Sequence, residues 1–107
     1  MRCYLVMIHG VFEYHLKPPP SGLDLDGFYA GRSLFARDEN EAQQRAFERV
    51  KDSLSEWNAD IRDGLVSLRL EADYINRVPF WYAFRRSNRS HIFYGEASRP
   101  PSSEDQT

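Results

Sequence analysis

The sequence is poor in cysteine and has no long hydrophobic run. Cys3 is the only cysteine among the 107 residues, so the chain can form neither an internal disulfide nor a cysteine-rich zinc site. No apolar stretch approaches the roughly 18–20 residues that a membrane span needs. The short apolar start also lacks the basic region and the small-residue cleavage site of a signal peptide. These absences predict a cytoplasmic protein that has no disulfide framework and no membrane contact.

Sequence motifs for catalysis and cofactor binding are missing as well. There is no glycine-rich dinucleotide loop, no phosphate-binding P-loop, no HExxH motif and no GxSxG motif. His9 and His15 would lie about 20 Å apart on a straight strand, which is too far for them to share a metal ion. Asp24 and Asp26 lack the further ligands and the closing glutamate of a calcium-binding loop. We therefore assign no catalytic, cofactor-binding or metal-binding residue and expect no cofactor.

The composition suits a single globular domain. Hydrophobic residues make up 41% of the chain and aromatic residues 14%, which is enough to bury a core at this length. The formal net charge of -2 hides an asymmetry, because residues 38–63 hold eight acidic and four basic side chains whereas residues 64–99 hold six arginines and three acids. We expect one domain over residues 1–97, followed by a C-terminal tail over residues 98–107 that is too polar to pack and is disordered.

Hydrophobic alternation with a period of two predicts five strands. Three of them cover residues 2–14, 27–37 and 65–75, and residues 80–86 and 90–96 are predicted to form a hairpin. Both faces of the first strand are apolar near its start, so this strand should be central in the sheet. Its two faces are expected to carry Tyr4, Val6, Ile8, Phe12 and Tyr14 on one side and Cys3, Leu5, Met7, His9, Val11 and Glu13 on the other.

The hydrophobic period changes to that of a helix after Asp38. Asp38 is a good N-cap, and Glu41 follows three residues later in a pattern close to a capping box. Apolar residues then recur at helical spacing up to Trp57, which predicts an amphipathic helix over about residues 39–57 that ends at Asn58. The element order ββαβββ predicts an α+β fold. It consists of a mostly antiparallel sheet of four to five strands with this helix on one face, in a ferredoxin-like or similar two-layer sandwich.

Aromatic and arginine residues gather near the C-terminus. Residues 80–94 contain six aromatic side chains, with arginines and a histidine between them. Side chains of these types dominate protein-interface hot spots, and they also stack on single-stranded nucleic acid. Core packing should account for at least half of the cluster, because strand alternation turns every second side chain inward. The candidates for partner binding are Trp81, Arg85, Arg86, Arg89, His91 and Tyr94.

The functional prediction depends on the single helix, which can cover only one face of the sheet. The other face of the first strand is also apolar, and an apolar face of this kind usually marks a partner site. The leading hypothesis is therefore a non-enzymatic interaction module. Its simplest partner is a second copy of the chain, in a homodimer that joins sheet to sheet or edge to edge.

Three other functions compete with this hypothesis. The first is an inhibitor, immunity or antitoxin-like protein whose acidic helix meets a basic partner. The second is single-stranded nucleic-acid binding through the C-terminal hairpin, which a sequence pI near 5.9 disfavours. The third, ranked last, is a small-molecule enzyme with a pocket between helix and sheet that uses His9 or Tyr74.

Overall fold

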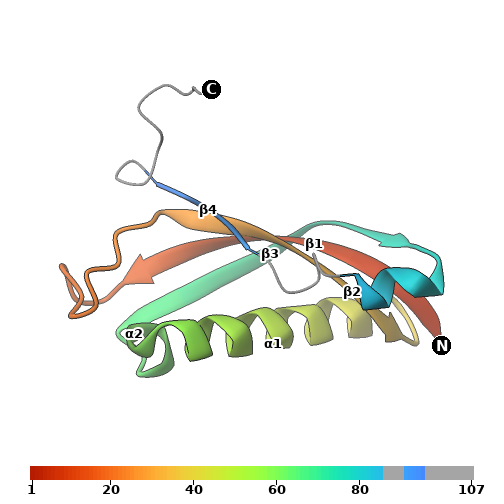
Figure 1. The fold of residues 1–107 in the computed structure, drawn as a ribbon, viewed down its shortest axis with the longest axis horizontal. Coiled ribbons are helices and arrows are strands. Elements are labelled where there is room, and N and C mark those ends of the chain that lie inside the picture. The colour runs from red at the N-terminus through yellow and green to blue at the C-terminus, as the bar shows by residue number, and fades with distance from the viewer. Residues whose placement is uncertain (86–90, 96–107) are drawn as a thin grey trace.

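The computed structural model describes residues 1–85 and 91–95, which form a two-layer α+β sandwich (Figure 1). Four strands make one antiparallel sheet in the order β3-β1-β2-β4, and the main helix packs against one of its faces. The elements along the chain are β1 (Arg2–Tyr14), β2 (Gly27–Ala36), α1 (Glu39–Trp57), α2 (Ala59–Arg62), β3 (Val66–Arg77), the 3-10 helix η1 (Phe80–Phe84) and β4 (Ile92–Tyr94). The predicted fold class is confirmed. None of the helices in the described ranges is long and apolar enough to span a membrane.

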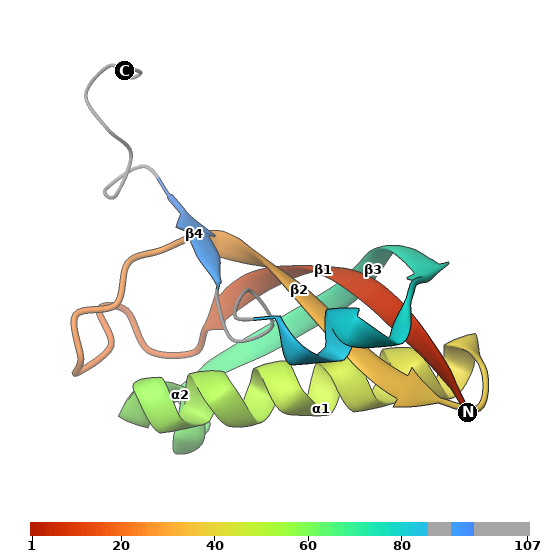
Figure 2. The same ribbon diagram turned by 45° about the vertical axis from the view of Figure 1, so that its right-hand side comes forward.

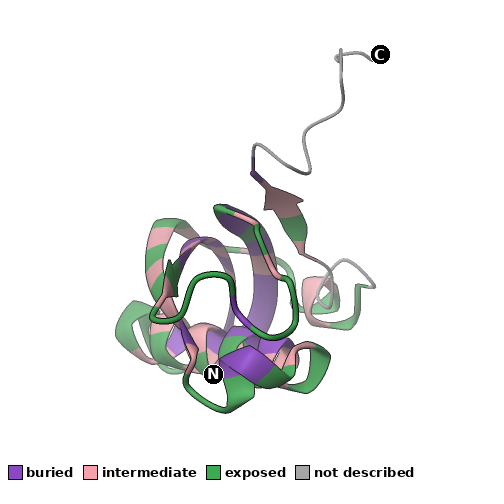
Figure 3. Cartoon of the chain, turned by 90° about the vertical axis from the view of Figure 1, so that its left-hand side faces the viewer, coloured by how far each residue is buried: buried purple, intermediate pink, exposed green. Residues whose placement is uncertain are grey.

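β1 is a central strand, as predicted, and its two faces differ in burial. Val6 and Ile8 are fully buried beneath α1, whereas Leu5 and Met7 on the opposite side are only half-buried. Figure 3 shows that the buried segments of the sheet and of α1 lie where these two layers meet. We name the sheet surface under α1 the helix face and the opposite surface the open face. By strand register, the open face carries Cys3, Leu5, Met7, His9 and Val11 of β1, Tyr29, Gly31, Ser33 and Phe35 of β2, Ser67, Arg69, Glu71 and Tyr74 of β3, and Ile92 and Tyr94 of β4.

α1 is set by its N-terminal cap and by a stripe of buried residues. The Asp38 carboxylate accepts a hydrogen bond from the Glu41 backbone amide at 2.9 Å, and the Glu41 carboxylate accepts one from the Arg37 backbone amide at 2.8 Å. The predicted helix over residues 39–57 is confirmed at both ends, and Asn58 ends α1 and caps α2. The stripe that packs on the helix face repeats every four residues and consists of Ala42, Ala46, Val50 and Leu54.

Gly10 lets neighbouring side chains of the core approach the centre of β1. Its strand partners are Phe28 on β2 and Leu70 on β3, and a side chain at residue 10 would run into the Phe28 ring and the Leu70 methyl. Phe28 is fully buried and packs its ring against Phe12 and Phe93. The glycine at this position is therefore a packing requirement of the core.

The predicted strand over residues 80–86 is wrong, because Phe80–Phe84 form the 3-10 helix η1. The Tyr82 amide donates to the Pro79 carbonyl and the Arg85 amide donates to the Tyr82 carbonyl, as in a tight helix. The predicted C-terminal hairpin is also wrong, since β4 pairs with β2. β3 and β4 lie at opposite edges of the sheet, so neither of them pairs with the strand nearest to it along the chain. Figure 2 shows η1 beside β1 and β2, at the end of the sheet where β1 begins.

Candidate interaction surface

The open face exposes apolar side chains along the middle of the sheet. Leu5, Met7 and Val11 of β1 are only half-buried there. Tyr29 on one side of them and Tyr74 on the other are 41% and 45% exposed. Ile92, the first residue of β4, is 70% exposed on the same face. The face therefore offers an apolar centre bordered by tyrosines and by the charged residues of β3.

Within the described chain, η1 is the element that covers part of the open face, and it covers only one end. Cys3 and Ser33, which both belong to the open face, are 5% and 3% exposed. The Cys3 thiol is hydrogen-bonded to the backbone of Ala83 in η1, which places η1 over this end. Burial raises the pKa of the Cys3 thiol, so this cysteine is protonated near neutral pH and acts as a packing residue.

His9 is the centre of a polar cluster that all four strands build on the open face. Its Nδ1 lies 3.3 Å from a Glu71 carboxylate oxygen, its Nε2 lies 2.5 Å from the Tyr94 hydroxyl, and its ring stacks on Tyr29 with a centroid distance of 4.8 Å. With Nδ1 protonated toward Glu71, Nε2 accepts the hydrogen bond that Tyr94 donates. Burial raises the pKa of Tyr94, and the nearby Tyr29, Asp26 and Glu71 raise it further, so its phenol stays neutral. This cluster fixes β4 to the sheet.

The three histidines occupy separate positions in the fold. His15 contacts the Ser67 hydroxyl at 2.6 Å, and His91 accepts a hydrogen bond from the Arg32 guanidinium at 3.0 Å. Desolvation lowers the pKa of His91 to about 4, and the Arg32 charge contributes to this shift. Among the residues that the structure describes, no three side chains suited to metal binding come together.

The structure distributes the predicted partner-binding residues over three places. Trp81 lies in η1, where Phe80, Trp81 and Phe84 are 61%, 58% and 76% exposed, and the exposed Arg85 follows directly as the C-cap of η1. Tyr94 lies on the open face beside His9. His91 is half-buried against the Phe28 ring on the helix face. The remaining two candidates, Arg86 and Arg89, lie outside the described residues, and so does the predicted tail over residues 98–107.

The site suggested for the lowest-ranked function is wrong. A pocket between helix and sheet cannot use His9 or Tyr74, because both side chains belong to the face opposite α1. The His9 cluster itself was missed by reasoning from sequence. His9 and Tyr94 are 85 residues apart, and only the strand order brings them together. The available signal was strand alternation, which places His9 on the same face as Leu5 and Met7, and Tyr94 on the same face as Ile92.

Comparisons of the chain with protein-family models, with curated proteins and with solved structures gave no match.

Proposed function

We propose that this protein is a non-enzymatic interaction module that pairs with a second copy of itself through the open face. The observation that supports this proposal is the apolar centre of that face, formed by Leu5, Met7 and Val11, which η1 leaves uncovered. Apolar surface removed from water contributes about 25 cal/mol per Å². Pairing two such faces would remove this surface from water in both copies.

The charges around the open face favour a second copy over a strongly charged partner. β3 borders the face with Arg69 and Glu71, so the border carries both signs of charge. A partner with one dominant sign of charge gains little from such a border. A two-fold axis brings the open face of a second copy against the open face of the first. One set of residues then supplies both sides of the contact.

The proposal is tested by the mass of the assembly in solution. Met7→Glu places a carboxylate in the centre of the open face, and an unpaired charge in a closed contact should weaken that contact by about a hundredfold. We expect Met7→Glu to halve the mass measured by sedimentation equilibrium. Gln44→Glu, which adds the same charge at an exposed position of α1, should leave the mass unchanged.

Two results would count against the proposal. One is a wild-type protein that sediments at 12.5 kDa, the mass of a single chain, at high micromolar concentration. The other is an unchanged mass for Met7→Glu with native circular dichroism. Val11→Lys provides a second variant on the same face, so that a folding defect of one variant does not decide the outcome.

A further inference from the structure

The outer edge of β3 is a second surface that can receive another chain. β3 is the last strand on its side of the sheet, and no described segment pairs with its outer side over Val66–Arg77. Natural proteins usually protect such an edge with proline, charged side chains or a bulge. β3 contains no proline, and its charges over residues 66–72 are one of each sign, Arg69 and Glu71, which repel a second copy only in some registers. Its irregularity is Asp73, the extra residue at the register shift between Met7 and Ile8 of β1, so residues 66–72 form a regular free edge.

The pairing with β1 determines which backbone groups of β3 point outward. The His15 amide donates to the Leu65 carbonyl at 3.1 Å. In an antiparallel ladder, hydrogen-bonded pairs alternate along the strands. The odd residues 67, 69 and 71 therefore exchange hydrogen bonds with β1. The residues whose amide and carbonyl groups face the free edge are Val66, Leu68, Leu70 and Ala72.

One antiparallel register of β3 with itself satisfies both the backbone and the charges. A two-fold axis at Leu70 places Leu70 opposite its own copy and Leu68 opposite Ala72 of the second copy, all with outward backbone groups. Arg69 then faces Glu71 of the second copy, twice, in the pairs whose Cα atoms approach to about 4.5 Å. Moving the axis by one residue places Arg69 opposite Arg69, or Glu71 opposite Glu71. The register centred on Leu70 is therefore the favoured one among these three.

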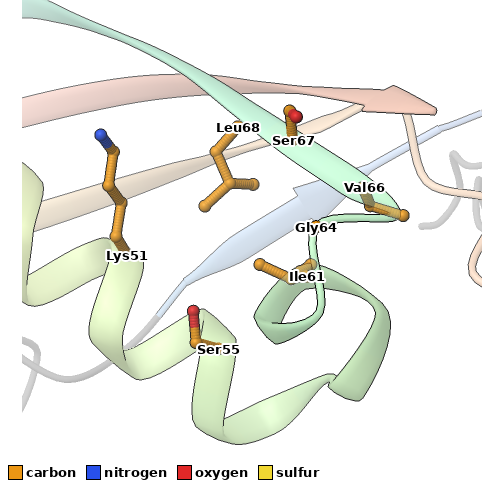
Figure 4. A pocket seen from close by; sticks show the side chains of 7 residues that line it. All are labelled: Lys51, Ser55, Ile61, Gly64, Val66, Ser67 and Leu68. Atoms are coloured by element: carbon orange, nitrogen blue, oxygen red, sulfur yellow. The ribbon is translucent and has the colours of Figure 1, made fainter. Parts of the chain in front are cut away.

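The side chains along this edge also leave apolar surface to cover. Leu68, Leu70 and Ala72 pack against the core from the edge and stay partly exposed. Between α1 and β3 lies a cleft of about 280 Å³ with Leu68 in its wall (Figure 4). A second β3 along the edge would lie beside this cleft and extend the apolar surface of the helix face. The cleft is lined by Lys51, Ser55, Ile61, Gly64, Val66, Ser67 and Leu68.

We infer that a second copy of the chain adds its β3 to this edge, antiparallel and centred on Leu70, to form a continuous eight-stranded sheet. The two-fold axis is perpendicular to the sheet, so both α1 helices lie on one side and both open faces on the other. This contact does not depend on the proposed pairing of open faces. A protein that makes both contacts assembles beyond two copies, and it closes at four copies of about 50 kDa where the two two-fold axes cross.

The edge contact is tested in the Met7→Glu background, where the open face is blocked. That protein should sediment at about 25 kDa, the mass of two chains. Arg69→Glu or Glu71→Arg, each added singly, turns two opposite-charge pairs into two like-charge pairs and should weaken the dimer by about tenfold or more. The double variant with both changes restores opposite charges and should recover the original affinity to within about threefold.

A loss of edge-dimer affinity in these variants can be distinguished from a loss of folding. The Arg69 and Glu71 side chains are both 71% exposed, so native circular dichroism is expected throughout. Because Glu71 also contacts His9 at 3.3 Å, Arg69→Glu, which leaves the His9 cluster intact, decides the test where the two single variants disagree. The control is the charge swap Arg62→Glu with Asp63→Arg on the exposed end of α2, which should leave the affinity unchanged.

Three results would overturn the edge contact. The first is a Met7→Glu protein that is monomeric at high micromolar concentration while the wild type is dimeric, which leaves the open-face proposal standing. The second is an affinity that the single charge changes do not alter. The third is a double variant as weak as the single variants, which would reject the register. A dimer that survives Met7→Glu and responds to the charge swap supports the edge contact.

Discussion

Substitution of Gly10 by alanine tests the packing of the core on the helix face of the sheet. In an ordinary strand, this change would stabilise the protein by about 0.4–1 kcal/mol, because alanine restricts the unfolded chain. Here the new methyl group would meet the Phe28 ring and would lie 2.9 Å from a Leu70 methyl. Overpacking of a close-packed core costs about 1–3 kcal/mol. We therefore expect Gly10→Ala to lower the free energy of unfolding by about 1–2 kcal/mol.

A double-mutant cycle with Phe28→Leu assigns this loss to the contact. The leucine side chain is smaller than the phenyl ring, so Gly10→Ala should cost at least about 1 kcal/mol less in that background. Urea unfolding followed by circular dichroism gives the four free energies, at one protein concentration because self-association adds to apparent stability. A stabilising effect of Gly10→Ala, or equal effects in both backgrounds, would refute the reasoning.

Two further predictions concern single residues. The pKa of His91 is about 4 in the fold against about 6.5 when unfolded, so its contribution is full above pH 6.5 and is lost as the pH falls toward 4. With a discount for the partly exposed ring, wild type should lose about 1–2 kcal/mol more than His91→Gln between pH 7 and 4.5 in urea unfolding, and equal losses would contradict this. Asp38→Ala removes the α1 cap and should cost about 1 kcal/mol in thermal unfolding, whereas Asp38→Asn should cost less; equal costs would contradict the capping role.

The elements that follow from local patterns could be predicted from the sequence. α1 carries its own signals, since Asp38 caps it and the apolar residues recur at helical spacing up to Trp57. The bounds and the two faces of β1 follow from the sequence, because its alternation is long and the loop after it contains Pro18–Pro20. These features depend on residues close together in the chain, which periodicity reports directly.

Features that depend on strand order could not be predicted in this way. Residues 80–84 are as aromatic as a strand, but the chain there must cross from one sheet edge toward the other, and η1 results. The His9 cluster combines Glu71 and Tyr94 from strands that no local pattern places beside β1 and β2. The free edge of β3 likewise becomes visible only when β3 is known to be the outermost strand.

We propose that the open face brings copies of this chain together. Sedimentation equilibrium of the wild type and of Met7→Glu at the same concentrations tests it most directly. We predict a wild-type mass at least twice the 12.5 kDa of one chain and half of that mass for Met7→Glu. A wild type that stays monomeric at high micromolar concentration, or a folded Met7→Glu protein with the wild-type mass, would contradict it.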